Sequence, residues 1–335
     1  MPVLLCQKPT LLNYSLLPTP HSLSLIKMNH QKDWQAKNLE AIQKRISWLQ
    51  KQPDGVIFSQ PSGIHFLTIR KNKFIIQLVL VEQVTLKMNW VQSILNLHNP
   101  TYLIFPYTQA MILALLWKSQ PKKIYIAGFG GGIIPQFLHH YLPDTIIECT
   151  EIDANILSIA QKFFGVELNE RLKVKIQDGR EYLEQKNYQA EYDIIMIDVA
   201  FGNGYMSYNL ATQEFYQLCD RHLSQSGVIV VNTLKSNGFE AEYIKTIQTV
   251  FPSIYICHTS GSNTIIIGTR GNPIGKEEIR EKAKFIQDYH QFSFPFLERA
   301  NDLKILEELP SLNLEKASIL QDTASPGNYF DSWLF

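Results

Sequence analysis

The sequence predicts an α/β protein with a mostly parallel, doubly wound sheet, preceded by a small antiparallel unit. Between Lys122 and about Gly268, short apolar runs alternate with helix-like segments, which is typical of a parallel sheet covered by helices. The first of these runs ends in a glycine cluster, and the next three end in acidic residues. Residues 50–85 instead show β-prone stretches joined by turn residues, which favours hairpins.

The first 30 residues are expected to be a poorly ordered extension. From Met1 to Ile26 the only charged residue is Lys8, and prolines interrupt the apolar runs, so a signal peptide is disfavoured. We expect an N-terminal helix over Asp33–Gln52, and Met28 is an alternative start of the native chain.

The hairpins are expected at Gly55–Gly63 and Ile64–Leu80, with turns at Pro61–Gly63 and Arg70–Lys73. We therefore divide the chain into the extension (1–30), a helix with a small β-hairpin domain (31–105), and a Rossmann-like domain with C-terminal helices and tail (106–335). Late strands are expected at Gly227–Asn232, Ile254–His258 and Asn263–Gly268, the last two as an antiparallel hairpin at the sheet edge.

The glycine cluster predicts a cofactor site. The strand Lys123–Ala127 leads into Gly128, Gly130, Gly131 and Gly132, and a helix-like segment follows. Glycine permits a positive φ and a close approach of backbone to ligand, and a helix N-terminus offers free N–H groups. This arrangement suits the polar part of a nucleotide-like cofactor.

The next three strands place carboxylates at the same edge of the sheet. They end at Glu151, at Asp178 followed by Gly179, and at Asp198. Ligands of open parallel sheets bind at the carboxyl ends of the strands, and an acid after the second strand can accept hydrogen bonds from ribose hydroxyls.

Two cofactors fit this layout. A nicotinamide dinucleotide prefers G-x-G-x-x-G, but the third glycine position is Ile133. S-adenosylmethionine (SAM) and its decarboxylated form use a Gly-x-Gly-x-Gly turn and an Asp after the third strand for the adenine amino group, which Asp178 provides. We favour the SAM-type ligand, with the dinucleotide as the alternative.

Composition removes several classes of partner. Lys+Arg and Asp+Glu are both 31, so there is no electrostatic case for nucleic acid or an anionic membrane. No apolar run approaches membrane-spanning length. The four cysteines are scattered without a CxxC pair, which favours reduced thiols and a cytoplasmic location. No metal is expected, because His139 and His140 are adjacent on a helix and point apart.

The order of the motifs resembles the spermidine/spermine synthases (polyamine aminopropyltransferases) and their methyltransferase-like relatives. The resemblance covers about residues 50–330 and rests on these segments: Tyr107 to Met111, Gly128–Gly132, Glu151–Asp153, Asp178–Leu183, Tyr192–Asp198, Leu210–Phe215, Gly227–Asn232 and, in degraded form, Leu320–Pro326. It implies a β-hairpin domain followed by a class I SAM-dependent methyltransferase fold, with a seven-stranded, mostly parallel sheet and an antiparallel edge hairpin. It also implies a homodimer or a homotetramer, of which we favour the homodimer.

The resemblance assigns roles to the motif residues. Gly128–Gly132 would wrap the methionine-derived part of the donor, Glu151 with Ile152 would bind the ribose, and Asp178 with Gly179 would hold the adenine. Asp198 would accept the proton of the attacking amine and contact the donor. The candidate acceptor-site residues are Tyr107, Gln109, Phe201, Tyr205 and Tyr208, the last two in a loop, 202–209, that is either a lid or a plain connection.

Three departures from the family pattern argue against a polyamine substrate. Gly131 and Phe201 occupy positions where spermidine synthases carry Asp, and Gln109-Ala110 replaces His-Glu. Burying a polycation without carboxylate partners is costly, and the loop Asp disfavours the carboxylate of intact SAM.

We therefore expect binding of SAM, its decarboxylated form or methylthioadenosine, and transfer of an alkyl group to a small non-polyamine acceptor by in-line displacement, with methyl as the favoured group. A true polyamine aminopropyltransferase and a non-catalytic adenosyl-ligand-binding homologue remain alternatives.

Overall fold

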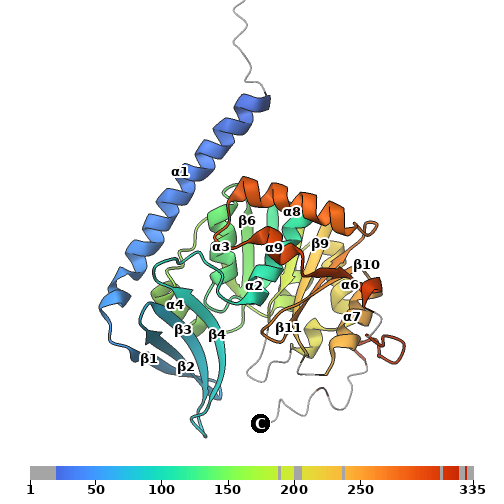
Figure 1. Cartoon of the computed structure of the whole chain (residues 1–335). Coiled ribbons are helices and arrows are strands. Elements are labelled where there is room, and N and C mark those ends of the chain that lie inside the picture. The colour runs from blue at the N-terminus through green and yellow to red at the C-terminus, as the bar shows by residue number, and fades with distance from the viewer. Residues whose placement is uncertain are drawn as a thin grey trace, which may run out of the picture.

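The computed structural model describes residues 20–187, 190–199, 206–235, 238–309, 312–323 and 329; the side chains of residues 20–30, 88 and 89 are not described. A long N-terminal helix lies along the outside of a small sheet and a larger α/β body (Figure 1).

The N-terminal helix, α1, spans Pro20–Ile46 and a 3₁₀ turn continues it over Ser47–Lys51. The expectation of a helix starting at Asp33 is therefore wrong in its boundary, and part of the expected extension is helical. Proline at a helix start removes no hydrogen bond, so Pro20 does not oppose this. Asn38 and Arg45 fix the helix to the body, through His140 (3.1 Å) and the carbonyl of Gly165 (2.8 Å).

The small domain is a four-stranded antiparallel sheet in the order β1-β2-β3-β4. Its strands are β1 (Gly55–Ser62), β2 (His65–Asn72), β3 (Ile75–Glu82) and β4 (Met88–Asn96). Both expected hairpins are present, with Gly63 and Lys73 in the left-handed region at their turns. The fourth strand was not predicted. Its pairing with β3 shifts register next to Leu78, which faces Ser93 while Val79 faces Val91.

The larger sheet has eight strands in the described part of the chain, in the order β12-β10-β11-β9-β8-β5-β6-β7. They span β5 (Lys123–Ala127), β6 (Ile146–Glu151), β7 (Leu172–Ile176), β8 (Tyr192–Ile197), β9 (Leu223–Leu234), β10 (Ser253–His258), β11 (Asn263–Thr269) and β12 (Leu303–Ile305). Strands β7, β6, β5, β8 and β9 run parallel.

The expected seven strands are all present, and β10 and β11 form the expected antiparallel hairpin. The additional strand, β12, pairs with β10 and takes the edge of the sheet.

Helices cover both faces of this sheet. On one face lie α2 (Pro106–Met111), the 3₁₀ turn Ile112–Leu116, α3 (Ile133–Tyr141), α4 (Ala154–Phe163), α8 (Lys276–His290) and α9 (Phe296–Ala300). On the other lie α5 (Gly179–Glu184), α6 (Gln213–His222) and α7 (Glu240–Gln248), with short 3₁₀ turns at Tyr208–Leu210 and Leu306–Glu308.

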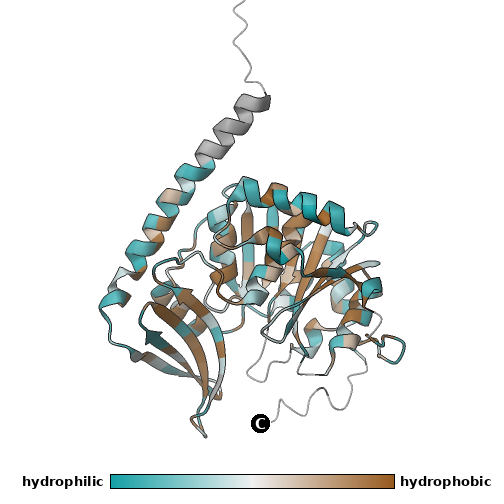
Figure 2. Cartoon of the chain, in the orientation of Figure 1, coloured by the Kyte–Doolittle hydropathy of each residue, from teal (hydrophilic) through white to brown (hydrophobic). Residues whose placement is uncertain are grey.

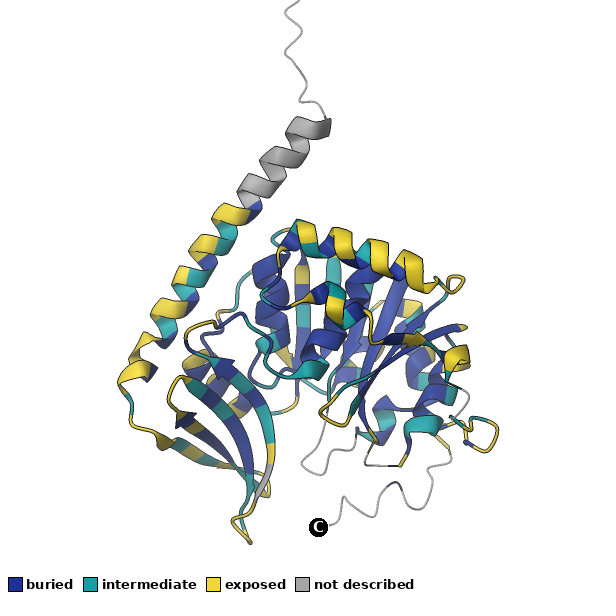
Figure 3. Ribbon diagram, in the orientation of Figure 1, coloured by how far each residue is buried: buried dark blue, intermediate teal, exposed yellow. Residues whose placement is uncertain are grey.

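The sheet core follows from the strand pattern. In β5, Ile124 and Ile126 point into one apolar layer while Tyr125 and Ala127 point into the other. A strand buried on both faces is expected to be apolar throughout, and the central strands are hydrophobic in Figure 2 and buried in Figure 3. The carboxyl ends of these strands are thereby held at one rigid edge.

The buried cysteines Cys149, Cys219 and Cys257 are free thiols, as expected. Within the described residues, no helix is both long enough and apolar enough to cross a membrane.

Candidate functional site

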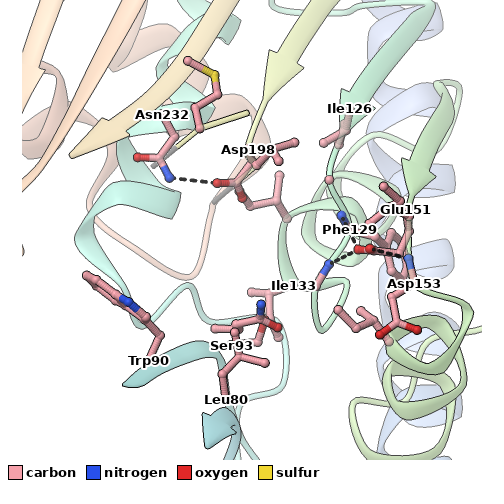
Figure 4. A pocket seen from close by; sticks show the side chains of 18 of the residues that line it. Leu80, Trp90, Ser93, Ile126, Phe129, Ile133, Glu151, Asp153, Asp198 and Asn232 are labelled. Carbon is pink, nitrogen blue, oxygen red and sulfur yellow. Dashed lines mark hydrogen bonds between the residues drawn. The ribbon is translucent and has the colours of Figure 1, made fainter. Parts of the chain in front are cut away.

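A cavity of about 810 Å³ opens at the carboxyl edge of the larger sheet. Its walls come from the glycine loop, from the ends of β6 to β9, from residues 104–108 and from the small sheet (Figure 4). The glycine loop and strand-end acids, distant in sequence, therefore meet in one place, as the sequence predicts.

The glycine loop is a tight turn in which Gly128 and Gly132 occupy positions that have no room for a Cβ. Gly128 has a φ of 95° and donates from its N–H to the carbonyl of Thr150 at 3.0 Å. A Cβ there would collide with the backbone carbonyl of Asp198. Gly132, with a φ of 71°, is the N-cap of α3. The loop brings β5 and β8 close together and starts α3 at the cavity.

Glu151, at the end of β6, holds this loop. Its Oε2 accepts hydrogen bonds from the N–H groups of Phe129 (3.3 Å) and Gly130 (3.2 Å), and its Oε1 accepts one from Asp153 (3.1 Å). Burial raises the pKa of the Glu151 carboxyl, and these backbone hydrogen bonds partly offset that effect. Glu151 therefore shapes the loop as well as facing the cavity.

Asp178 and Gly179 lie where β7 passes into α5. One oxygen of Asp178 caps the helix by accepting from the N–H groups of Arg180 (2.8 Å) and Glu181 (3.1 Å). Its second oxygen is 3.5 Å from the amide nitrogen of Asn209. The Tyr125 hydroxyl donates to the carbonyl of Gly179 at 2.9 Å. The side chain is therefore fixed, with its second oxygen only weakly engaged.

Asp198 ends β8 on the other side of the cavity. It accepts a hydrogen bond from Asn232, at the end of β9, at 2.8 Å. Burial raises the pKa of the Asp198 carboxyl to about 6, although the Asn232 amide lowers it. Burial, with the charge of Asp198, raises the pKa of the nearby Tyr107 hydroxyl well above its usual value. Asp198 is therefore suited to accept a proton near neutral pH.

The small sheet reaches the same site. The Ser93 hydroxyl of β4 accepts a hydrogen bond from the N–H of Gly131 at 2.8 Å. Ser62 of β1 hydrogen-bonds the carboxylate of Asp153, which also caps α4 through the N–H of Asn155 at 2.8 Å. Both strands therefore contact the loops that carry the predicted donor residues.

Most of the predicted donor-site residues line the cavity, and two belong to the glycine loop without facing the cavity. Those that line the cavity are Gly128, Gly130, Glu151, Ile152, Asp178, Gly179, Asp198 and Tyr107. Gly131 and Gly132 belong to the loop but their positions face protein atoms, not the cavity.

Two predicted acceptor residues lie elsewhere. The Gln109 amide donates to the carbonyl of Leu103 (2.7 Å) and accepts from Arg299 (3.2 Å), so it is a buried structural group. The Tyr208 hydroxyl donates to the carbonyl of Gln321 at 2.7 Å. Phe201 and Tyr205 lie outside the described residues, as does the first half of the loop 202–209.

Sequence reasoning missed Asn232 and Ser93. Asn232 ends a predicted strand, and the rule that found Asp198 would have found it. Ser93 gave no signal, because its strand was not predicted. Among the described residues no cluster of three or more His, Cys, Asp or Glu side chains could hold a metal ion.

The chain is similar to known proteins of two kinds, polyamine aminopropyltransferases and a protein methyltransferase. Residues 104–262 match the family model of the spermine/spermidine synthase domain. A polyamine aminopropyltransferase of Vibrio vulnificus is 29% identical over 228 residues, which cover 67% of this chain and 75% of that protein. The human eEF1A lysine and N-terminal methyltransferase is 28% identical over 209 residues, 56% of this chain and 30% of that protein.

Solved structures give the same two branches. Human methyltransferase-like protein 13 in complex with SAH has a TM-score of 0.52 and 27% identity, covering 56% of this chain and 92% of that chain. A probable spermidine synthase from Corynebacterium glutamicum has a TM-score of 0.58 and 18% identity, covering 79% of this chain and 98% of that chain. At this identity the similarity shows the fold alone.

The fold and site thus define a SAM-type transferase with the methyltransferase-like α/β architecture. Within that class, residues 104–262 are similar to the spermine/spermidine synthase domain, the family that the sequence resembles.

Proposed function

We propose that this protein binds intact SAM and transfers its methyl group to a small, non-polyamine acceptor by in-line displacement. The observation that carries the proposal is the lining of the acceptor side of the cavity, which is mostly apolar and poor in carboxylates.

That lining comes from the small sheet and from residues 104–108. Its larger side chains are Leu67, Leu80, Trp90, Ile104 and Phe105. Glu82 is the one acidic residue among the described residues of this wall, and it hydrogen-bonds Thr85 at 2.5 Å. A diamine or polyamine would bury its cationic groups there with few partners, which is costly. An uncharged or singly charged acceptor fits better.

The opposite wall suits the adenosyl part of the donor. Glu151 would accept a hydrogen bond from the ribose and Asp178, with Gly179, would contact the adenine. The sulfonium then lies between this wall and Asp198. SAM supplies an activated methyl group, and the protein contributes binding and orientation.

Asp198 would act on the acceptor. As the acceptor's lone pair forms a bond to the methyl carbon, the carbon–sulfur bond breaks and its electron pair stays on sulfur, giving S-adenosylhomocysteine. The acceptor's proton passes to the Asp198 carboxylate. The raised pKa of this carboxyl favours such a transfer near neutral pH.

An aminopropyltransferase is the second candidate, and the Vibrio vulnificus relative favours it. A non-catalytic adenosyl-binding protein is the third. We also propose a cytoplasmic homodimer.

Calorimetry with SAM, decarboxylated SAM and methylthioadenosine, followed by turnover assays with putrescine and with uncharged small nucleophiles, separates these candidates. We expect SAM to bind more tightly than its decarboxylated form and putrescine not to be consumed. Tighter binding of decarboxylated SAM with turnover of putrescine would establish the second candidate. Binding without turnover of any acceptor would favour the third, and no binding would reject all three.

A further inference from the structure

The glycine loop has no backbone N–H left for a ligand. Glu151 takes the N–H groups of Phe129 and Gly130, Ser93 takes that of Gly131, and carbonyls take those of Gly128 and Gly132. A donor lying across this loop must therefore find its hydrogen-bond donors elsewhere.

Ser93 offers one. A serine hydroxyl carries one proton and two lone pairs, and here a lone pair is used by Gly131 at 2.8 Å. No hydrogen bond within the described residues uses the hydroxyl proton. Ser93 is 7% exposed and lines the cavity, so this proton is available to a bound ligand and shielded from bulk water.

The start of α3 adds two further donors beside Ser93. The first residues of a helix have N–H groups without partners in the helix. Ile133 and Ile134 occupy this turn and line the same cavity, and the described residues provide no acceptor for either N–H. Helix α3 contacts β4, the strand that carries Ser93, and both Ile133 and Ser93 are labelled in Figure 4. A hydroxyl and two helix-start amides form a site that favours an anionic group.

The packing around Gly131 explains why no acid stands in the loop. A Cβ on Gly131 would lie 2.7 Å from the Cβ of Ser93 and 3.0 Å from the ring of Phe164. An aspartate at residue 131 would therefore displace the strand or the ring. The space for a loop carboxylate is filled by Ser93 itself.

We propose that Ser93 determines the donor: its hydroxyl proton, with the N–H groups of Ile133 and Ile134, binds the α-carboxylate of intact SAM. This inference rests on the proposed function, since it names the part of SAM that the cavity distinguishes. Decarboxylated SAM lacks the carboxylate, and methylthioadenosine lacks the whole amino-acid tail, so neither gains from this contact.

The test is calorimetry of wild type, Ser93→Ala and Ser93→Asp with SAM, S-adenosylhomocysteine, decarboxylated SAM and methylthioadenosine. A hydrogen bond to a charged group predicts that Ser93→Ala weakens SAM and S-adenosylhomocysteine by about 10-fold more than methylthioadenosine. Ser93→Asp keeps an acceptor for Gly131 but adds a negative charge. It should shift the preference towards decarboxylated SAM by about 10-fold or more.

A matched control is Ser59→Ala, in the same sheet, where Ser59 pairs with Thr68 at 3.0 Å and does not line the cavity. It should leave all four affinities unchanged. If Ser93 only fastens the sheet to the loop, Ser93→Ala will weaken all four ligands equally, which would overturn the inference. If wild type binds none of the four, the proposed function itself fails.

Discussion

Replacing Glu151 with Gln tests the donor site most directly, because this side chain both faces the cavity and holds the glycine loop. Three backbone N–H groups donate to its carboxylate, at 3.1–3.3 Å. A carboxylate has about four lone-pair sites. Three are thus occupied, and the N–H of Ile152 also acts on this carboxylate, so at most one remains for a ribose hydroxyl rather than the two hydroxyls expected from sequence.

The expected loss of affinity follows from this count of lone-pair sites. Losing one hydrogen bond to a charged acceptor costs about 1.5–3 kcal/mol, so the dissociation constant of S-adenosylhomocysteine should rise about 10- to 150-fold. The free energy of unfolding should fall by less than the free energy of binding does. The Gln carbonyl can still accept from Phe129 and Gly130 while its amide faces the N–H of Asp153, and burying a neutral amide is cheaper than burying a carboxylate. We expect a melting temperature only a few degrees lower.

Calorimetry with S-adenosylhomocysteine and a thermal melt measure both effects. Glu167→Gln is the matched control: Glu167 has a 66% exposed side chain and pairs with Arg45 away from the cavity. Affinity within twofold of wild type for Glu151→Gln, at an unchanged melting temperature, would refute the ribose assignment.

Three further substitutions test the remaining roles. Asp198→Asn should lower turnover by about 10²- to 10⁴-fold, the usual contribution of a general base, and donor binding should be retained. The rate of the wild type should rise with pH and level off above about 6, because the Asp198 carboxyl must be deprotonated and its pKa is about 6. Asn232→Leu removes the amide that lowers this pKa, so the midpoint of the rate profile should move to higher pH; an unmoved midpoint would mean that another group titrates. Asp178→Ala should cost about 1 kcal/mol in denaturant unfolding through loss of the α5 cap and should weaken methylthioadenosine as much as SAM, since both contain adenine; a selective loss of SAM would contradict the adenine contact.

Most of the larger domain could be predicted from the sequence, because apolar runs alternate there with helix-like segments. Buried parallel strands are apolar and end in distinctive residues, so Glu151, Asp178 and Asp198 could be brought together without a structure. The hydrogen bonds of these residues could not be predicted, because the approach of Glu151 to the N–H groups of Phe129 and Gly130 depends on loop geometry. β12 was missed because three residues carry no clear period.

The acceptor side was harder to predict. Gln109 was aligned with a family position by sequence spacing, yet the fold turns its amide towards Leu103 and Arg299. The small sheet's contribution depends on β4, whose irregular pairing obscures the alternation of its residues. Contacts between distant segments, such as Ser93 with Gly131, produce no periodic pattern in the sequence from which they could be predicted.

The hydrogen bonds from Ser62 and Ser93 also bear on any attempt to shorten the protein. A fragment limited to residues 104–262 would keep the glycine loop and the strand-end acids, yet it would lack the wall that encloses them. Gly131 would lose its acceptor and Asp153 would lose a partner, and the proposed donor site would be more exposed to water. Such a fragment would preserve the family signature and lose the side of the cavity that the small sheet forms.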